Sequence, residues 1–285
     1  MDAPHTYRIC FCGISIRFIF PGPVVLPEEM QRFLCADSGP ADAQFEVHLL
    51  TQPLSLPAAP FHTYRDTQIY RTGKGWLRVC TPLTTGDGLQ VACLLCPDGC
   101  HRLYYPASMW DFYASPIRCL HLIGIETLLL ERDAFLLHSS VVLHEGRAVL
   151  FSGPAGAGKS TQAALWQKHL DAQILNGDRC VIRKYPDGFR GGGSPWAGTS
   201  GIYRQEQAPI AAIFLVSQAP ENRVRRLGAE AFGALFSQTI VNSWDPVFME
   251  RMVCLFQQLL AQVPIYLLCC RPDEGAVHAA LQAIS

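Results

Sequence analysis

The sequence predicts an α/β fold made of two parts. Short apolar runs separated by Gly, Pro and Asp turns fill the first 106 residues, which is typical of an antiparallel sheet. From residue 134 onward, strand-like and helix-like patterns alternate, which favours an α/β arrangement. Between the two, the apolar spacing is helical. We therefore divide the chain into a small β-rich N-terminal domain (1–106), a connecting helix (107–133) and an α/β domain (134–285).

The composition is that of a globular protein. Hydrophobic residues make up 49% and charged residues 16% of 285, which argues against a disordered chain. The net charge of −1 gives no broad attraction to nucleic acid or to an anionic membrane, so we expect neither as a partner. The first twenty residues lack the features of a signal peptide, and we expect no membrane helix. The sequence therefore favours a cytoplasmic protein. Assembly into a homo-oligomer is left open.

Twelve cysteines raise the question of disulfides or metal. We expect a reducing compartment, in which most cysteines are small buried hydrophobic residues. The sharpest metal candidate is the group Cys93, Cys96, Cys100 and His101. A second ligand pair at zinc-finger spacing is missing, and a β-hairpin accounts for the same residues. The sequence favours the hairpin but leaves metal binding undecided.

The N-terminal region begins with one predicted strand over residues 6–20. A proline-rich loop over 53–60 separates the early strands from the later ones. The remaining strands are predicted over 45–50, 67–70, 75–80, 89–96 and 101–105.

The α/β domain begins with strand-like runs at 134–137 and 141–144, followed by the tight turn Glu145-Gly146. Later strands are predicted at 147–151, 173–178, 181–184, 211–216 and 264–270. Asp245-Pro246 opens a helix with a capping Asp and a Pro in the first turn, and 273–284 forms the last helix. The side chains of Phe248, Met252, Leu255 and Leu259 are expected to line the inner face of the Asp245-Pro246 helix.

The segment Gly153–Thr161 matches the phosphate-binding pattern G-x-x-x-x-G-K-[ST]. It follows the strand predicted at 147–151 and opens a helix predicted over 161–170, which is the order that phosphate binding requires. Glycines allow successive backbone N–H groups to point at phosphate oxygens, and the helix N-terminus adds partial positive charge. Lys159 would reach the outer phosphates, and the Ser160 hydroxyl would join a magnesium shell. The predicted nucleotide-binding residues are Gly153, Ala155, Gly156, Ala157, Gly158, Lys159, Ser160 and Thr161.

The next predicted strand ends in an acidic residue. It runs over 173–178, and its last residue, Asp178, could hold the metal or accept a proton from an attacking hydroxyl. An Asp in an ordinary β-turn is the alternative. Further on, the glycine-rich segment 191–199 reads as a flexible loop that could close over a substrate, although Trp196 argues for packing.

Four segments in this order resemble the HPr kinase/phosphorylase C-terminal domain and its relative, ATP-dependent phosphoenolpyruvate carboxykinase. They are His138-Ser139-Ser140, Gly153–Thr161, Asn176-Gly177-Asp178-Arg179 and Gly193-Ser194-Pro195-Trp196. The likeness covers about 134–284 and is nearest to small bacterial HPr-kinase-like proteins with an N-terminal β-rich domain.

The resemblance implies a P-loop domain that uses ATP or another NTP with Mg²⁺ and transfers a phosphoryl group to a hydroxyl. The acceptor would be a Ser or Thr of a peptide or protein, or a small molecule. Lys159, Asp178 and His138 would be the catalytic residues, and Ser160 and Asp178 would hold the metal. His138 would lie beside the glycine-rich loop.

One position departs from the family. Where two adjacent aspartates are usual, this chain has Gly177-Asp178. A metal-bound carboxylate is a weaker base, so one Asp cannot easily fill both roles. Two alternatives to a kinase therefore stay open. One is a catalytically weak nucleotide-binding accessory or regulatory module, and the other is a simple NTP hydrolase, for which Arg204 is the candidate arginine finger.

Overall fold

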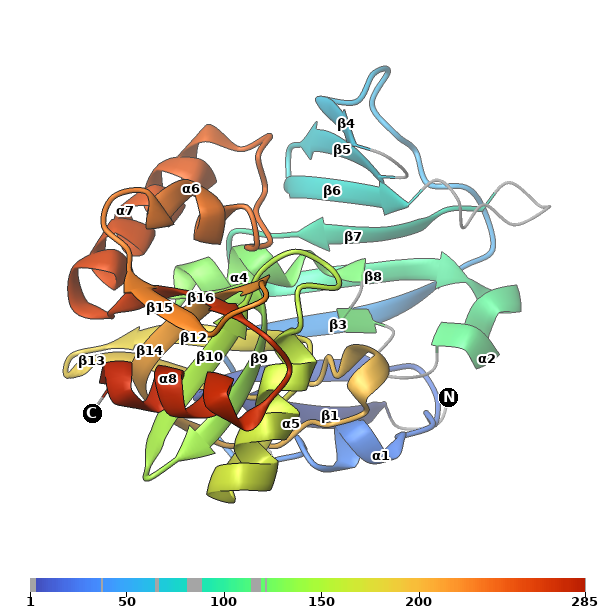
Figure 1. Ribbon diagram of the computed structural model, residues 1–285. Coiled ribbons are helices and arrows are strands. Elements are labelled where there is room, and N and C mark those ends of the chain that lie inside the picture. Colours follow the sequence, from blue (N-terminus) through green and yellow to red (C-terminus); the bar gives the residue numbers. More distant parts are fainter. Residues whose placement is uncertain are drawn as a thin grey trace. The chain divides into compact units, whose positions relative to one another are not determined.

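The computed structural model describes residues 4–36, 38–64, 67–80, 89–113, 119–120 and 122–284. It is mixed α/β, with two large sheets and few helices (Figure 1). The chain divides into two compact units, Met1–Ile125 and Glu126–Ser285. Each unit contains one of the sheets, and we describe the two separately.

The sheet of the first unit has the strand order β1-β2-β3-β8-β7-β6-β5-β4. We predicted an antiparallel sheet, but β3 runs parallel to both of its neighbours, β2 and β8. The reason is the path of the chain, which leaves β3, forms β4 to β7, and returns to place β8 beside β3. The strands are β1 (His5–Phe11), β2 (Ile14–Phe20), β3 (Ala43–Leu50), β4 (His62–Tyr64), β5 (Thr67–Thr72), β6 (Gly75–Cys80), β7 (Val91–Leu95) and β8 (Cys100–Pro106).

The single strand predicted over 6–20 is wrong, because this stretch is a hairpin of β1 and β2. The turn is made by Cys12 and Gly13, whose φ angles are +50° and +70°. Two positive φ angles in a row produce the twist that suits a two-residue hairpin, and glycine adopts the second without strain. Alternating apolar residues continue through the turn, so their pattern alone does not reveal it.

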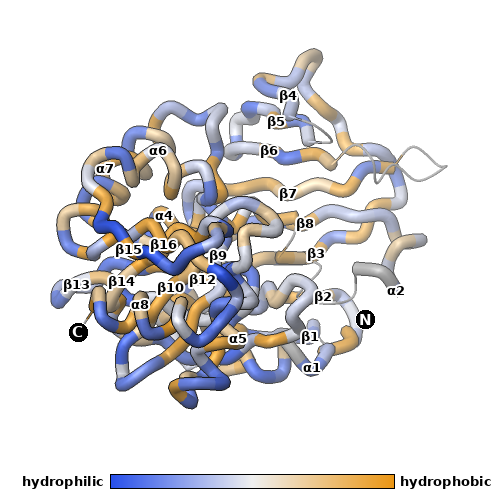
Figure 2. The backbone as a smooth tube through the Cα atoms, viewed as in Figure 1, coloured by the Kyte–Doolittle hydropathy of each residue, from blue (hydrophilic) through white to orange (hydrophobic). Residues whose placement is uncertain are grey.

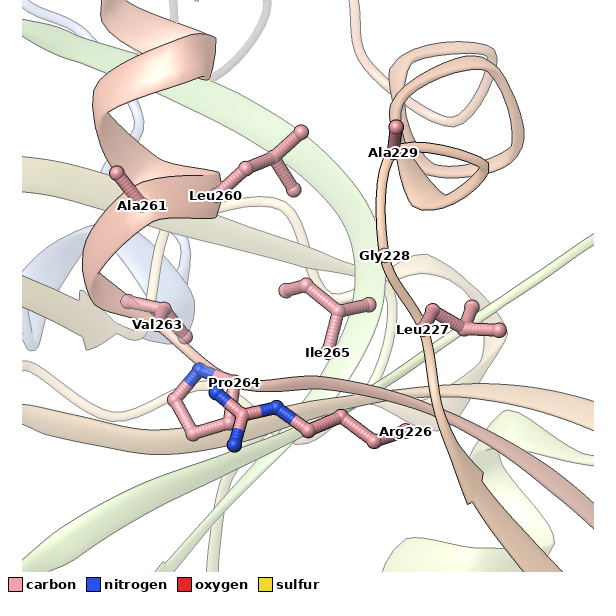
Figure 3. A pocket seen from close by; sticks show the side chains of 9 residues that line it. All are labelled: Arg226, Leu227, Gly228, Ala229, Leu260, Ala261, Val263, Pro264 and Ile265. Atoms are coloured by element: carbon pink, nitrogen blue, oxygen red, sulfur yellow. The ribbon is translucent and has the colours of Figure 1, made fainter.

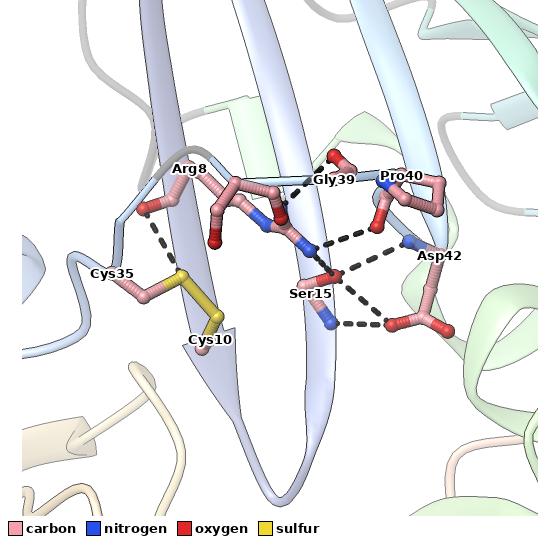
Figure 4. The surroundings of a disulfide bond; sticks show 8 residues. Arg8, Cys10, Ser15, Cys35, Gly39, Pro40 and Asp42 are labelled. Carbon is pink, nitrogen blue, oxygen red and sulfur yellow. Dashed lines mark hydrogen bonds between the residues drawn. A yellow bond between two sulfur atoms is a disulfide. The ribbon is translucent and has the colours of Figure 1, made fainter.

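A disulfide joins Cys10 of β1 to Cys35, which follows the short helix α1 (Glu28–Gln31) (Figure 4). Beside it, the Arg8 guanidinium donates hydrogen bonds to the backbone oxygens of Ser38, Gly39 and Pro40. The bond departs from our expectation for these two cysteines. Of the ten free cysteines, five are buried, in keeping with small hydrophobic residues.

The connecting helix predicted over 107–133 is not continuous. Its described residues include the 3₁₀ turn η1 (Ala107–Met109), the short helices α2 (Trp110–Tyr113) and α4 (Ile125–Glu131), and helical residues at 119–120 and 122. The part of the prediction that covers 114–118 and 121 lies outside the described residues. Gly124 interrupts the helical path with a φ of +58°. A Cβ there would lie 2.3 Å from the Arg78 guanidinium, so a glycine suits both the backbone and the packing.

The sheet of the second unit has the order β10-β9-β12-β13-β14-β16-β15, with β11 beside β9. An additional parallel pairing of β10 with β14 links strands that are distant along this order. The two runs predicted at 134–137 and 141–144 form one long strand, β9 (Ala134–His144), which pairs with β12 through its first half and with β10 through its second. The others are β10 (Arg147–Ser152), β11 (Gln173–Asn176), β12 (Arg179–Tyr185), β13 (Gly188–Gly192), β14 (Gln207–Gln218), β15 (Arg223–Arg226) and β16 (Ile265–Cys270).

Helices pack against this sheet through two apolar clusters. One cluster includes Ala163 and Trp166 of α5 (Lys159–Leu170) and Ala276 of α8 (Glu274–Ile284). The other contains α6 (Ala231–Phe236) and α7 (Pro246–Gln262). The predicted inner residues of α7, Phe248, Met252, Leu255 and Leu259, are all buried in that cluster.

The first turn of α7 has a side-chain cap. Asp245 caps α7, because its Oδ1 accepts the backbone N–H groups of Val247 and Phe248.

The edge strand β15 has the sequence Arg-Val-Arg-Arg and is coloured as hydrophilic in Figure 2. Charged side chains on an edge strand discourage pairing with other chains. Among the described residues, no helix is long and apolar enough to cross a membrane.

Candidate functional site

The predicted phosphate-binding segment lies between the end of β10 and the start of α5. Gly153, Gly156 and Gly158 have φ angles of +142°, +77° and +107°. These left-handed values favour glycine and let the loop turn sharply onto the helix. Gly158 is the N-cap of α5, so the first turn of a twelve-residue helix directly follows the loop. The loop thus leads directly into the N-terminus of α5, where the partial positive charge of the helix lies.

The ammonium of Lys159 lies against this loop. Its Nζ donates to the backbone oxygens of Gly153 at 2.9 Å and Pro154 at 3.0 Å. Burial lowers the pKa of Lys159, and the nearby negative charge of Asp178 opposes that shift. A lysine ammonium has three N–H donors, so one remains for an oxygen bound at the loop.

Asp178 is held by an Asx turn at the end of β11. The buried Asn176 side chain accepts the backbone N–H groups of Asp178 and Arg179 through Oδ1, both at 2.8 Å. Its Nδ2 donates to the backbone oxygens of Ser194 and Trp196. One amide thus fixes the turn that carries Asp178 and joins it to the next loop.

His138 lies on β9, opposite Arg179 of β12. Its Nε2 is 3.4 Å from Oδ1 of Asp178, and Arg179 Nε is 3.4 Å from the other carboxylate oxygen. Burial and the positive charge of Lys159 lower the pKa of His138, against the opposing effect of Asp178. Both effects favour the neutral form of the imidazole.

The structure brings together the three residues that we predicted to be catalytic, His138, Lys159 and Asp178. Of the other predicted binding residues, Ala155, Gly156, Ser160 and Thr161 are exposed, whereas Ala157 lies at the edge of the core. This arrangement provides a cation on the glycine-rich loop and an imidazole beside a carboxylate. It can bind an anion and accept a proton next to it.

The position of the missing aspartate is filled by another segment. A Cβ on Gly177 would lie 2.3 Å from Oγ and 2.5 Å from Cβ of Ser200. Ser200 belongs to the 3₁₀ turn η2 (Gly198–Ser200), and its hydroxyl donates to the Ala197 oxygen at 2.6 Å. Gly198 has a φ of +56°, and a Cβ there would lie 2.7 Å from the Asp178 side chain. The η2 turn therefore packs directly on Gly177 and Asp178.

The prediction of a flexible glycine-rich loop is wrong for residues 191–196. Gly191 and Gly192 belong to β13, and all six residues are buried, including Trp196 at 5% exposure. A Cβ on Gly193 would lie only 2.0 Å from the Arg204 backbone oxygen. Glycine is present here because two backbone segments approach closely.

The hairpin interpretation of the Cys93–His101 region is confirmed, since β7 and β8 pair antiparallel. Nδ1 of His101 accepts the backbone N–H of Cys96 at 3.0 Å. Burial raises the pKa values of the Cys93 and Cys96 thiols, which disfavours the thiolate that a metal needs. Within the described part of the chain, no group of three or more His, Cys, Asp or Glu side chains could hold a metal ion.

The candidate arginine finger has a structural contact. Nε of Arg204 donates to the Ile174 backbone oxygen at 3.2 Å, and the Arg204 backbone N–H donates to the Leu175 oxygen. Arg204 therefore stabilises β11 through hydrogen bonds to its backbone.

Cavities lined by described residues occur in the second unit. One, of about 290 Å³, adjoins the glycine-rich loop at Ala157 and Gly158. The other, of about 250 Å³, is lined by the end of α7, the start of β16 and the segment after β15 (Figure 3). Arg226 is the charged residue among its described lining residues, and most of the others are apolar.

Known proteins show only a distant structural similarity to this chain. One solved structure that matches is that of the Hpr(Ser) kinase/phosphatase from Coxiella burnetii, with 13% identity and a TM-score of 0.30. The match covers 52% of this chain and 88% of that one. A likeness at this identity and TM-score is too weak to carry an inference about function. No family model matches the chain, and no curated protein matches it.

Two residues of this region were not singled out from the sequence. Asn176 was noted only as part of a motif, although an Asn two residues before a functional Asp is a recognisable Asx-turn signal. Ser200 carries no local signal, because its importance depends on a contact with a residue that is distant in the sequence.

Proposed function

We propose that the chain is an ATP-dependent kinase that transfers a phosphoryl group to a hydroxyl of a peptide, protein or small molecule. The observation that carries the proposal is the placement of the Lys159 ammonium on the loop carbonyls of Gly153 and Pro154, with the charge of Asp178 close enough to affect its pKa. Cation and carboxylate in this order around a glycine-rich loop are the parts that phosphoryl transfer needs.

In this proposal the backbone N–H groups of Ala155, Gly156 and Gly158 and the third N–H of Lys159 bind the phosphates, because Pro154 has no N–H and that of Ala157 donates to the Pro154 oxygen. The ammonium stays in place because two carbonyl oxygens hold it, so little reorganisation accompanies binding. The residue that accepts the acceptor's proton is either Asp178 or His138. His138 is a candidate because its Nε2 lies 3.4 Å from Oδ1 of Asp178.

A Mg²⁺ ion is part of this proposal. Mg²⁺ is commonly bound by one or two carboxylates together with substrate phosphates and water, so a cluster of several acidic side chains is not required. The Asp178 carboxylate and the Ser160 hydroxyl would hold the ion. When bound, it would neutralise charge on the phosphate oxygens.

The proposal is tested with labelled ATP, Mg²⁺ and an extract that contains acceptors. We expect Lys159→Ala and Asp178→Asn each to lower label transfer by at least about a hundredfold, because each removes charge stabilisation or proton transfer. The matched control is Lys168→Ala, which removes an exposed lysine from the same helix. Retained transfer in both site variants, with their fold intact, would contradict a kinase.

A second function, a nucleotide-binding module without turnover, is favoured by the packing of Ser200 on Gly177. It predicts that ATP raises the melting temperature by mass action while no acceptor is ever labelled. Steady phosphate release without any acceptor would instead point to an NTP hydrolase.

A further inference from the structure

The cavity of about 250 Å³ in Figure 3 lies at the opposite end of β16 from the glycine-rich loop. Ile265, the first residue of β16, lines this cavity, whereas Cys270, the last, lines the cavity beside Gly158. The ends of a six-residue strand lie about 17 Å apart, so the two cavities are separate sites. A volume of about 250 Å³ is close to the lower end of the range for small-molecule sites.

The centre of this cavity is bordered by apolar side chains. Leu227, Leu260 and Ile265 surround it (Figure 3). Ile265 is buried in the large apolar cluster of the second unit, and Leu227 and Leu260 pack against that cluster but are only partly buried. Apolar surface therefore remains that a ligand could cover, and its burial would favour binding. The cavity suits a ligand with a compact apolar body.

Arg226 gives the rim of the cavity an unpaired positive charge. Of the three arginines on β15, Arg223 pairs with Glu221, and Arg225 pairs with Glu230 at 2.9 Å. Arg226 takes part in none of the ion pairs or side-chain hydrogen bonds of the described residues. Its side chain is exposed and extends along the lower edge of the cavity in Figure 3. A free guanidinium of this kind can bind a carboxylate through two parallel N–H donors.

The end of α7 gives the same cavity a negative side. In a continuous helix the Leu260 oxygen would accept the N–H of residue 264, but Pro264 has none. The N–H of Val263 donates to the Leu259 oxygen instead, so the helix offers the Leu260 oxygen no partner. The last turn of this 17-residue helix contains no basic residue, and its C-terminus carries partial negative charge. A cationic N–H donor is therefore favoured here.

We propose that this cavity binds a free apolar α-amino acid of about the size of leucine or phenylalanine. The carboxylate of the ligand pairs with Arg226, its ammonium donates to the carbonyl oxygens at the end of α7, and its side chain lies against Leu227 and Ile265. A ligand with a carboxylate alone would place negative charge at the negative end of α7. A peptide carboxyl terminus would bring an amide N–H there in place of a full positive charge. The free amino acid complements both charges of the site.

The experiment measures dissociation constants by ligand-observed NMR titration of the whole chain. The ligands are L-leucine and L-phenylalanine, each compared with its amide and its N-acetyl derivative. We expect at least one of the two amino acids to bind with a Kd of about 1 mM or below. The amide lacks the carboxylate and the N-acetyl derivative lacks the ammonium, so each binds at least about tenfold more weakly than the amino acid.

A pair of variants on β15 places the ligand in this cavity. In Arg226→Gln the affinity for the amino acid falls at least about tenfold, because the carboxylate loses its charged partner, while the affinity for the amide is unchanged. Arg223→Gln is the matched control. It removes an exposed arginine from the same strand that does not line the cavity, and it leaves every affinity unchanged.

The absence of binding by either amino acid to the unaltered protein overturns the assignment. An N-acetyl derivative that binds as tightly as its amino acid also overturns it, and would indicate a peptide carboxyl terminus instead. Retained affinity in a folded Arg226→Gln protein does the same. If Arg226→Gln fails to fold, the comparison of the amino acid with its two derivatives still decides. None of these results bears on the kinase proposal, and Lys159→Ala is expected to bind the amino acid normally.

Discussion

Two glycine-rich segments of the second unit have similar compositions and different physical roles. In 153–158 the glycines have positive φ angles, and a Cβ on Gly156 would meet nothing within 4 Å. In 191–193 the would-be Cβ atoms of Gly191 and Gly193 meet neighbouring atoms at 3.1 Å and 2.0 Å. Gly156 and Gly158 serve backbone conformation beside open space, whereas Gly153 combines a positive φ with a Cβ position only 3.1 Å from the Val216 oxygen. Gly191 and Gly193 serve close packing alone. Glycine content alone therefore does not distinguish a binding loop from a packed one.

The largest effect is expected for Gly193→Ala. The new methyl group would meet the Arg204 backbone oxygen at 2.0 Å, and backbone cannot move aside cheaply. We expect a loss of about 4 kcal/mol or more in the free energy of unfolding, measured by urea denaturation. Gly233→Ala is the matched control, because a Cβ there meets nothing within 4 Å and the site is helical, so it should be neutral or stabilise by up to about 1 kcal/mol. A Gly193→Ala protein as stable as the unaltered one would remove the distinction between the two segments.

A smaller effect on stability is expected at Gly177, which precedes Asp178 and is packed as closely as the glycines of 191–193. Gly177→Asp restores the second carboxylate but places its Cβ against Ser200, at a cost of about 2 kcal/mol. Adding Ser200→Gly removes both contacting side-chain atoms, so the double variant should recover more than half of that loss. The coupling between the two substitutions is read from a double-mutant cycle of unfolding free energies. Additive effects would show that Ser200 does not occupy the place of the missing side chain.

The smallest effect on stability is expected for Gly156→Ala. Its cost is conformational, because the backbone has a φ of +77° while the space around it is open. We expect a loss of about 1 kcal/mol in unfolding free energy, together with at least about tenfold weaker tripolyphosphate binding, because the amides of the loop lose their alignment. Tripolyphosphate binding that stays unchanged would argue against a role for this loop in holding phosphates.

Local signals in the sequence were sufficient for the elements whose determinants are local. The cap at Asp245, the inner face of α7, and the strand–loop–helix order around Lys159 all depend on neighbouring residues. The predictions that were wrong depend on contacts between residues that are far apart in the sequence. Residues 107–133 read as one helix because the contact of Gly124 with Arg78 is invisible in a local pattern. The segment 191–196 read as flexible because nothing in it indicates the backbone of Arg204.

The same reasoning applies to the candidate site. His138, Lys159 and Asp178 were chosen from motifs, and their mutual geometry came only from the structure. The packing of Ser200 on Gly177 could not be read from the sequence, because it depends on how distant segments meet.

The position of β8 in the first sheet has a consequence for synthesis on the ribosome. It lies between β3 and β7, and it is the last strand of that sheet to be made. Until Cys100–Pro106 has emerged, the edges of β3 and β7 that it later covers are unpaired. Unpaired strand edges readily recruit other chains. A nascent chain that stalls before β8 is therefore at greater risk of aggregation than one that stalls after it.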